Sequence, residues 1–446
     1  MGIGMNRSFH GSVLTVLVMG IAFACLTTQT APVQADHDDM GLPHGLTIVR
    51  PNNVRDIFRS LFGGDGIRLS ENSGFGHDAH YTIQTFQGLD NLGQAIAGNV
   101  GFLSFNSVVA GFTLNMETGE PVRTTDSLGP LLAENPNTLG KGKLNIGFTY
   151  TRVKFDRFEG VDLGNLSLRL DHPDVIGPSI GEDPVGPPDG ELAPVSVPFP
   201  PFVLDFELDQ VLIDLSLRLT QDIYTVFANY GLTDNWDVGI IVPIITVRAK
   251  VTAWASIFDP TSETESPHAF DDASDQPVSI STASATGIGD IILRTKYNLL
   301  RDEEDKPALA IGGKIVLPTG DEDELLGLGE TRLMALLILA KTFGTLTPHA
   351  NIGYEYVPGE SQLDSVRYVL GADLALLPAW TVAVDLLGRW EHSGDDIGDH
   401  LVDFAAGTKV EVVENVLLSI NLKFPLNKDE GLRADVIWSV GGEVTF

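Results

Sequence analysis

The sequence predicts an all-β fold, an antiparallel transmembrane β-barrel of about twelve strands, with fourteen as the alternative count. Through the second half of the chain, strand follows strand, and the side chains of each alternate between an apolar and a polar face. The links between these strands are short on one side and longer and more acidic on the other. After the N-terminal segment, no apolar run reaches the ~18 residues that a membrane-spanning helix needs.

Composition narrows the class of protein. The 446 residues are 43% hydrophobic with a mean hydropathy of +0.10, which excludes a bundle of membrane helices. The formal net charge of −32 argues against nucleic acid as a partner, because phosphates would be repelled. It also argues against attachment to anionic lipid through a polybasic segment.

The first 35 residues are predicted to be a secretory signal peptide. The apolar run 13–25 is followed by the small-residue site 33–35 and then by acidic residues, so we expect cleavage near Ala35. Cleavage there would remove Cys25, the only cysteine, and with it any disulfide or thiolate chemistry. The alternative, a lipoprotein acylated at Cys25, is weaker because 22–24 is a poor acylation signal.

Residues 36–126 are predicted to form an N-terminal plug inside the barrel or a cap beside it. Their pattern is irregular, although 54–62 could form a short helix with one apolar face. The 107–126 stretch reads as a β-hairpin, and its entry into the wall would raise the strand count to fourteen.

Residues 127–446 are predicted to form the barrel. In the strand 380–391, Trp380, Val382 and Val384 share one face, whereas Asp385 and Arg389 lie on the other. The predicted wall strands lie near 143–158, 207–230, 236–256, 284–300, 307–318, 330–343, 347–357, 364–377, 380–391, 400–413, 415–425 and 432–446.

The links between these strands predict the orientation in the membrane. Short links include 232–235, 377–379 and 414–415, and the C-terminus lies on the same side. The opposite side carries the acidic loop 259–275 and the Pro-rich stretch 172–201, which cannot hold a regular sheet. Such asymmetry is typical of outer-membrane barrels, whose long loops face outward.

Aromatic residues near strand ends agree with this placement. Trp236, Trp380, Trp390 and Trp438 are expected in the two aromatic girdles of the barrel. Trp438 and Val444 share one face of the last strand with the terminal Phe446, and this arrangement resembles the signal read by the outer-membrane assembly machinery.

Several stretches carry a resemblance to a known family. The turn YGLTDNWDVG at 230–239, the motif GIGD at 287–290 with Lys296-Tyr297, and LPTGD at 317–321 resemble the channels of the MetA-pathway of phenol degradation family. The resemblance covers roughly 144–446 and extends more distantly to long-chain fatty acid channels of the outer membrane. It implies passive uptake of small hydrophobic or aromatic compounds. Residues 36–126 and 172–201 match nothing in that family.

Candidate lumen-lining residues follow from the polar faces of the strands and from one apolar wall. The stretch 332–339 is apolar on both faces, although the lumen-facing side of a barrel strand is ordinarily polar. This predicts either an apolar lumen surface, along which a hydrophobic substrate moves, or a wall that the plug covers. The charged candidates could also neutralise one another as structural pairs. The candidates are Asp214, Arg218, Arg294, Lys296, Arg332, Leu336, Arg367, Asp373, Asp385 and Arg389.

Other motifs are weak. Gly177–Gly181 matches the Gly-x-Ser-x-Gly motif of a nucleophile elbow, but it lies among prolines, where the required strand and helix cannot form. His77 and His80 could bind a metal ion, but no third ligand lies at helical spacing from them. We therefore expect no enzyme activity, cofactor or metal site. Expected partners are outer-membrane lipid, lipopolysaccharide, the assembly machinery and a small hydrophobic substrate. The alternative function is a structural barrel whose acidic loops bind ions, lipopolysaccharide or another cell.

Overall fold

The computed structural model describes residues 46–58, 60–62, 69–71, 112–114, 121–123, 127–171, 210–258, 268–270, 277–303, 306–360, 363–391 and 400–446. The predicted signal peptide, most of the predicted plug and the Pro-rich loop lie outside these residues. Among the described residues, no helix is both long enough and apolar enough to cross a bilayer.

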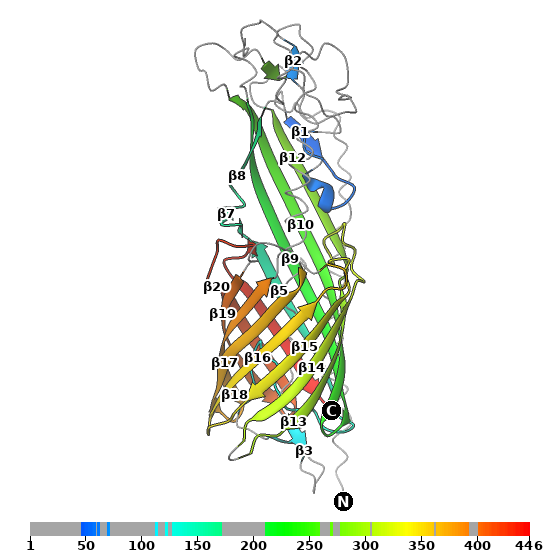
Figure 1. Cartoon of the computed structure of the whole chain (residues 1–446), viewed down its shortest axis with the longest axis vertical. Coiled ribbons are helices and arrows are strands. Elements are labelled where there is room, and N and C mark those ends of the chain that lie inside the picture. Colours follow the sequence, from blue (N-terminus) through cyan, green and yellow to red (C-terminus); the bar gives the residue numbers. More distant parts are fainter. Residues whose placement is uncertain are drawn as a thin grey trace, which may run out of the picture. The chain divides into compact units, whose positions relative to one another are not determined.

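Twelve antiparallel strands close into a barrel, which confirms the predicted fold and strand count (Figure 1). Each strand pairs with the next around the ring, and the last, β22, pairs with the first, β5. The strands are β5 (Leu144–Phe155), β9 (Gln210–Thr233), β10 (Trp236–Phe258), β13 (Ile291–Leu300), β14 (Ala308–Leu317), β15 (Arg332–Ala340), β16 (Leu346–Tyr356), β17 (Ser365–Leu377), β18 (Trp380–Glu391), β19 (His400–Val413), β20 (Val416–Pro425) and β22 (Ile437–Thr445).

The predicted N-terminal hairpin does not enter the wall. Its strands, β3 (Phe112–Leu114) and β4 (Pro121–Arg123), form a two-stranded sheet of their own. The alternative count of fourteen strands is therefore wrong.

Two wall strands continue past the rim of the barrel and build an extension. The long strands β9 and β10 pair with each other along their whole length. On the far part of β10 lies β12 (Val278–Ile288), which carries β1 (Leu46–Val49) on its other edge, and β8 (Leu166–Asp171) lies beside β9. Small sheets formed by β2 (Leu69–Glu71) with β11 (His268–Phe270), and by β6 (Arg157–Phe158), β7 (Val161–Asp162) and β21 (Leu432–Arg433), complete the described elements.

The predicted helix at 54–62 forms only a short 3-10 turn, η1 (Arg55–Ile57). Its apolar face was nevertheless predicted in the right place, because Val54, Ile57, Phe58 and Leu61 are all buried in the apolar cluster of the extension. They pack beside the odd-numbered residues of β9 and β10. This cluster, and not a regular helix, determines the conformation of the segment.

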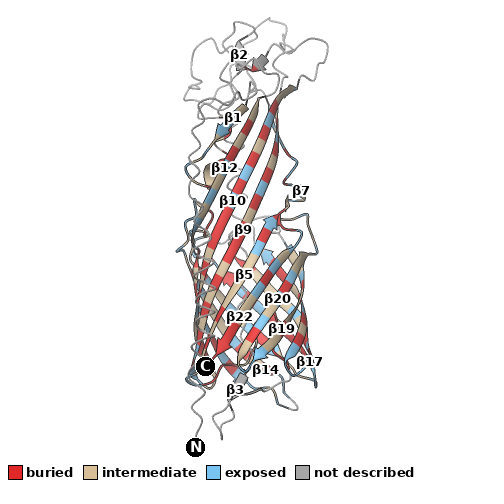
Figure 2. Cartoon of the chain, turned by 180° about the vertical axis from the view of Figure 1, so that it is seen from behind, coloured by how far each residue is buried: buried red, intermediate tan, exposed pale blue. Residues whose placement is uncertain are grey.

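The outer wall of the barrel is apolar, as a lipid-facing surface must be. Burial alternates along each strand, with exposed and buried residues taking turns (Figure 2). Polar side chains instead fill the buried inner face, among them Asn145, Asp237, Lys296, Asn351 and Lys409. Exposed apolar residues of the wall include Ile240, Leu293, Ile315, Leu337, Ile352, Val384, Phe404, Ile420 and Val440. This inverted polarity identifies an outer-membrane β-barrel.

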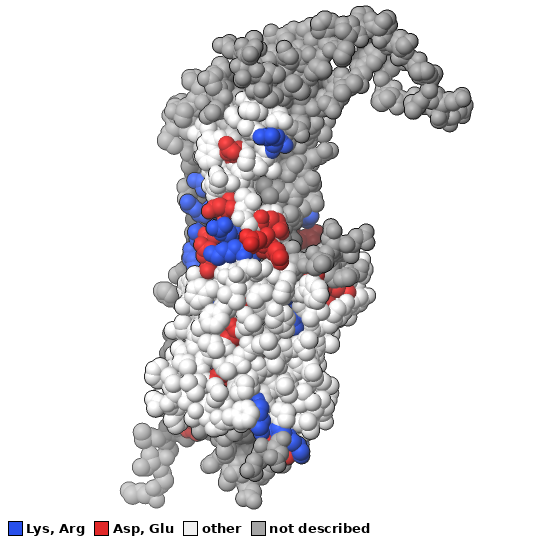
Figure 3. Space-filling model, turned by 60° about the vertical axis from the view of Figure 1, so that its left-hand side comes forward, with Lys and Arg blue, Asp and Glu red and all other residues white. Residues whose placement is uncertain are grey.

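Charged residues mark the limits of the apolar band. Lys, Arg, Asp and Glu gather in a belt above a largely uncharged wall, and a smaller group lies at the lower end (Figure 3). The four predicted girdle tryptophans are exposed, with Trp236 and Trp380 at the short-turn end of their strands. Trp390 and Trp438 lie at the opposite end of theirs.

Short turns join the strands on the side of the C-terminus. Asp302, in the turn after β13, accepts hydrogen bonds from the Lys341 ammonium at 3.0 Å and the Thr342 amide at 2.8 Å. Partial burial raises the pKa of Asp302, but these contacts outweigh it and hold the pKa below its ordinary value. Phe446 completes the ring, since its amide donates to the carbonyl of Leu144 at 2.8 Å.

The chain enters β5 through a close passage over β9. A Cβ on Gly231 would lie 1.9 Å from the carbonyl oxygen of Gly140, so only glycine allows this approach. The passage is held by two backbone hydrogen bonds, from Gly142 to Gly231 at 2.8 Å and from Gly231 to Lys143 at 2.9 Å.

Replacing Gly231 with alanine is therefore expected to push the 140–143 backbone off β9. We expect the free energy of unfolding to fall by about 1–3 kcal/mol, as for other overpacked sites. Urea unfolding followed by tryptophan fluorescence measures it. Gly313→Ala is the control, because its Cβ would meet its nearest atom at an ordinary 3.4 Å. Equal stability of the two variants would contradict the prediction.

Candidate functional site in the barrel lumen

A stretch without regular secondary structure, residues 127–141, lies inside the barrel and is called the inner segment below. Its residues from Ser127 to Ala133 are all buried. The sequence analysis assigned 127 to the start of the barrel, but the first wall strand begins at Leu144. The inner segment instead crosses the lumen, where polar side chains from several wall strands hold its backbone.

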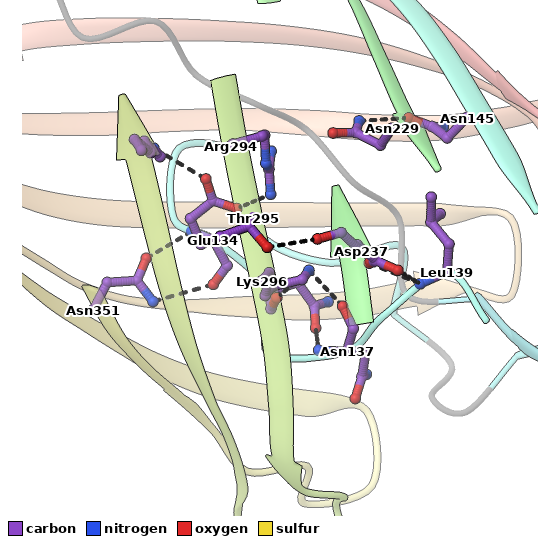
Figure 4. Close-up of polar contacts among 12 residues, drawn as sticks. Glu134, Asn137, Leu139, Asn145, Asn229, Asp237, Arg294, Thr295, Lys296 and Asn351 are labelled. Atoms are coloured by element: carbon purple, nitrogen blue, oxygen red, sulfur yellow. Dashed lines mark hydrogen bonds and ion pairs between the residues drawn. The ribbon is translucent and has the colours of Figure 1, made fainter. Parts of the chain in front are cut away.

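Glu134 is the electrostatic anchor of the inner segment. Its carboxylate lies 2.7 Å from the Arg294 guanidinium on β13 and 3.1 Å from the Lys314 ammonium on β14. The Asn351 side chain on β16 accepts from the Glu134 amide at 2.6 Å and donates to its carbonyl at 3.1 Å (Figure 4). Three strands thus hold one residue by both its side chain and its backbone.

The part of the inner segment after Glu134 is held by its carbonyl groups. The Lys296 ammonium donates to the carbonyl oxygens of Asn135 at 2.8 Å and Asn137 at 2.5 Å (Figure 4). Asp237 on β10 accepts the Leu139 amide hydrogen bond at 3.0 Å. Because these wall side chains are buried, they supply the hydrogen bonds that an irregular backbone needs away from water.

The part before Glu134 rests on a buried cluster around a histidine. The His349 imidazole lies between two carboxylates, 3.2 Å from Asp373 and 2.6 Å from Asp385. Asp373 accepts a hydrogen bond from the Ser127 hydroxyl, and Asp385 accepts one from the Leu132 amide at 3.0 Å. Both imidazole nitrogens are engaged by carboxylates, so this cluster holds the segment and does not activate the serine.

Above the inner segment, on the long-loop side, the lumen holds a cavity of about 190 Å³. Leu132 and Glu134 lie on its floor, and most of its wall comes from the upper ends of the barrel strands. Its lining is largely apolar and includes Phe155, Ile292, Val316, Met334, Leu336, Val369, Leu387, Leu401, Leu432 and Ile437.

Charges on the cavity lining show an excess of cations. Among the described lining residues, six are Lys or Arg and three are Asp or Glu. Each of these three carboxylates contacts two cations. The groups are Glu134 with Arg294 and Lys314, Glu355 with Arg332 and Arg367, and Asp403 with Lys423 and Arg433. Arg389 also pairs with Glu391 at 2.6 Å and Arg332 with Asp290 at 3.6 Å, which leaves a smaller positive excess in a chain that is strongly acidic overall.

The structure places the predicted lumen residues in three groups. Arg332, Leu336, Arg367 and Arg389 line the cavity. Arg294, Lys296, Asp373 and Asp385 contact the inner segment or the histidine that supports it.

Asp214 and Arg218 form the third group, and they are exposed on the outer face of β9. This differs from the expectation because that part of β9 lies in the extension. Its apolar face packs into the extension cluster there instead of facing lipid, so the polar face turns outward.

Sequence reasoning missed Glu134, His349 and Asn351. The last two lie on the polar face of the strand 346–356, so alternation alone contained the signal for them. Glu134 lies in an Asn- and Pro-containing stretch directly before the first strand, and no periodicity marks it.

Among protein-family models, one matches the sequence of this chain. The model of the family described as MetA-pathway of phenol degradation matches residues 212–433. No curated protein matches the chain.

Among solved structures, an outer-membrane channel from Pseudomonas putida F1 is similar at 12% identity and a TM-score of 0.45, over 71% of this chain and all of that one. The toluene transporter TbuX of Ralstonia pickettii is similar at 11% identity and a TM-score of 0.34, over 77% and 98%. A FadL homologue of Pseudomonas aeruginosa is similar at 11% identity and a TM-score of 0.27, over 68% of this chain and 88% of that one.

Glu134→Gln is expected to loosen the inner segment, because it leaves the buried Arg294 and the partly buried Lys314 without their carboxylate. Removing one partner of a buried ion pair costs about 3–5 kcal/mol. We expect a larger single-channel conductance in planar bilayers, with folding checked by heat-modifiable migration. Glu303→Gln, which removes an exposed pair with Lys306 in a short turn, is the control and should leave the conductance unchanged. A normal conductance in folded Glu134→Gln would count against the anchor.

Proposed function

The chain belongs to the MetA-pathway of phenol degradation family, and on that premise we propose that its barrel is a channel for passive uptake of small hydrophobic or aromatic compounds. The observation that carries this proposal is the largely apolar cavity inside a membrane-spanning barrel, which Leu132 and Glu134 of the inner segment help to line. The cavity can hold a small aromatic molecule against apolar side chains.

Leu336 marks the apolar path. It lies across from Gly312 on β14 and from Gly353 on β16. With glycine on both sides, its side chain meets no larger neighbour in its own row of the sheet. Together with Met334 it presents a smooth apolar surface to the cavity. A hydrophobic solute can move along such a surface without breaking hydrogen bonds.

The inner segment is the element that must move for passage. It lies on the route from the cavity to the short-turn side, and its contacts are hydrogen bonds and ion pairs that a shift can exchange for water. We propose that the inner segment closes the lumen, a role that the sequence analysis assigned to residues 36–126. The described parts of 36–126 include η1 and β1, which contact strands of the extension.

The partners expected from sequence belong to the same proposal. Trp438 and Phe446 are exposed, whereas Val444 of the predicted assembly signal is buried. We propose that Trp438 and Phe446 are the contacts for the assembly machinery, with lipopolysaccharide around the outer rim.

Flux measurements test the proposed function. The mature protein is first shown to migrate as a heat-modifiable barrel, and liposome swelling then compares sugars with a small neutral aromatic. Passage of the aromatic with little sugar supports a hydrophobic channel. Ready sugar flux makes the protein a general porin. No flux of either solute favours the alternative, a structural barrel whose acidic loops bind ions, lipopolysaccharide or another cell.

Leu336→Asp is expected to slow flux of the neutral aromatic about tenfold or more, because a carboxylate on the apolar path costs at least as much as one lost apolar side chain. Liposome swelling measures it, and heat-modifiable migration confirms folding. Leu336→Met is the control, since it keeps the volume and the apolar character. Equal flux through both folded variants would remove Leu336 from the path.

The cationic lining predicts a preference by charge. We expect benzoate to pass several-fold faster than benzylammonium of similar size, because the lining residues repel a cation and attract an anion. Raising the ionic strength should reduce the difference, since salt screens charges near water. Faster passage of benzylammonium at low salt would contradict the prediction.

A further inference from the structure

A second charged site lies on the outer face of the sheet, away from the lumen. It consists of Arg152 and Lys154 on β5, Arg218 on β9, and Arg248 and Lys250 on β10, and is called the outer cationic patch below. All five side chains are exposed on one face of three neighbouring strands. This places five cations on a surface that cannot serve the channel interior.

Strand register brings the five cations together. Lys154 and Arg248 both lie opposite Thr220 of β9, in one row across the three strands. Arg152 lies in the next row on one side, opposite Asp222, and Arg218 pairs with Lys250 in the next row on the other. With strands ~4.8 Å apart and rows ~6.7 Å apart, the patch covers roughly 10 by 13 Å.

Few carboxylates offset these charges. Asp222 is buried, and it contacts both Arg152, at 3.4 Å, and Arg248. Lys154 pairs with Asp156 at 2.6 Å.

Arg218 and Lys250 have no acidic partner among the described residues. Three of the five cations therefore form ion pairs, with two carboxylates, and a third carboxylate, Asp435, lies near Lys154 but pairs with Lys428 at 2.6 Å. The patch has a positive excess although the chain has a net charge of −32.

Aromatic residues border the patch on its membrane side, with Tyr150 and Tyr224 one row below Arg152 and Trp438 beside it. The ring of Tyr150 is 5.0 Å from that of Tyr224 and 5.2 Å from that of Trp438. Trp438 lies opposite Arg152 in the ladder, and the Tyr150 hydroxyl donates to Asp222 at 2.6 Å. Tyrosine and tryptophan prefer the depth where acyl chains meet headgroups. The patch is therefore at the height of lipid headgroups.

We propose that the outer cationic patch binds the phosphate groups of lipopolysaccharide in the outer leaflet. Phosphate is the group that Arg and Lys clusters recognise best, and an anchored lipid brings it to this height with acyl chains against the aromatic cluster below. The inference rests on the outer-membrane placement of the proposed channel but not on its substrate. A free anion would gain nothing from the aromatic cluster.

The test variant is Arg218→Gln with Lys250→Gln. These two substitutions leave the Arg152–Asp222–Arg248 network intact, so the fold is preserved. The full mature protein is purified in detergent, and binding of rough lipopolysaccharide, of the same material after phosphatase treatment, and of inorganic phosphate is followed by native mass spectrometry. The matched control is Lys141→Gln with Lys306→Gln, two exposed lysines on the short-turn side.

We expect the wild-type protein to bind intact lipopolysaccharide more tightly than the dephosphorylated form. Each lost cation should weaken binding about fivefold, so we expect the test variant to bind intact lipopolysaccharide roughly 25-fold more weakly, whereas the control binds like wild type. Equal binding of both lipid forms, or of test variant and wild type, would overturn the proposal. Binding of inorganic phosphate as tight as that of the lipid would also overturn it. Aromatic flux through the test variant should be normal, so failure of the channel function is seen separately.

Discussion

Everything in this structure depends on the requirement that backbone amides and carbonyls inside lipid find hydrogen-bond partners. A sheet meets this requirement only when its edges join, which they do where β22 pairs with β5 and Phe446 with Leu144. Closure in turn forces every second side chain inward. Since the outward residues must be apolar, the inward ones are where polar chemistry collects. The inner segment uses these inward polar groups, because an irregular backbone in the lumen needs the same kind of partners as a strand.

The same logic explains why the lumen and the extension differ although β9 and β10 run through both. Within the membrane, their odd-numbered residues face the lumen and include Asn229 and Asp237. Beyond the rim, the odd-numbered residues become Val, Ile, Leu and Ala, and they pack into a closed apolar cluster with Val54 and Phe58. The even-numbered face changes in the opposite sense, from lipid-facing Ile240 to the exposed Arg248. One strand therefore inverts its polarity at the height where the surrounding medium changes from lipid to water.

This inversion sets how much could be predicted from the sequence. Alternation and link length were enough for twelve strands, their approximate bounds and the orientation of the short turns. The lumen candidates within the membrane, such as Arg332 and Arg367, were placed by the same parity and do lie at the cavity. Asp214 and Arg218 were not placed correctly, because the alternation of residues identifies which side chains share a face of a strand but not whether that face meets lipid, water or the lumen. Glu134 was out of reach for another reason, since its environment is assembled from β13, β14 and β16 by closure of the ring.

The inner and outer surfaces share one electrostatic feature, which is that single carboxylates there contact two cations each. Carboxylates greatly outnumber cations in the chain, yet the lumen wall and the outer cationic patch both contain single carboxylates that bridge two cations. One nearby cation helps to keep a buried carboxylate ionised, and a second cation leaves a positive excess that can act on another group. In the lumen that excess faces the cavity, and on the outer wall it faces the headgroup layer. The net charge of −32 therefore says little about either surface.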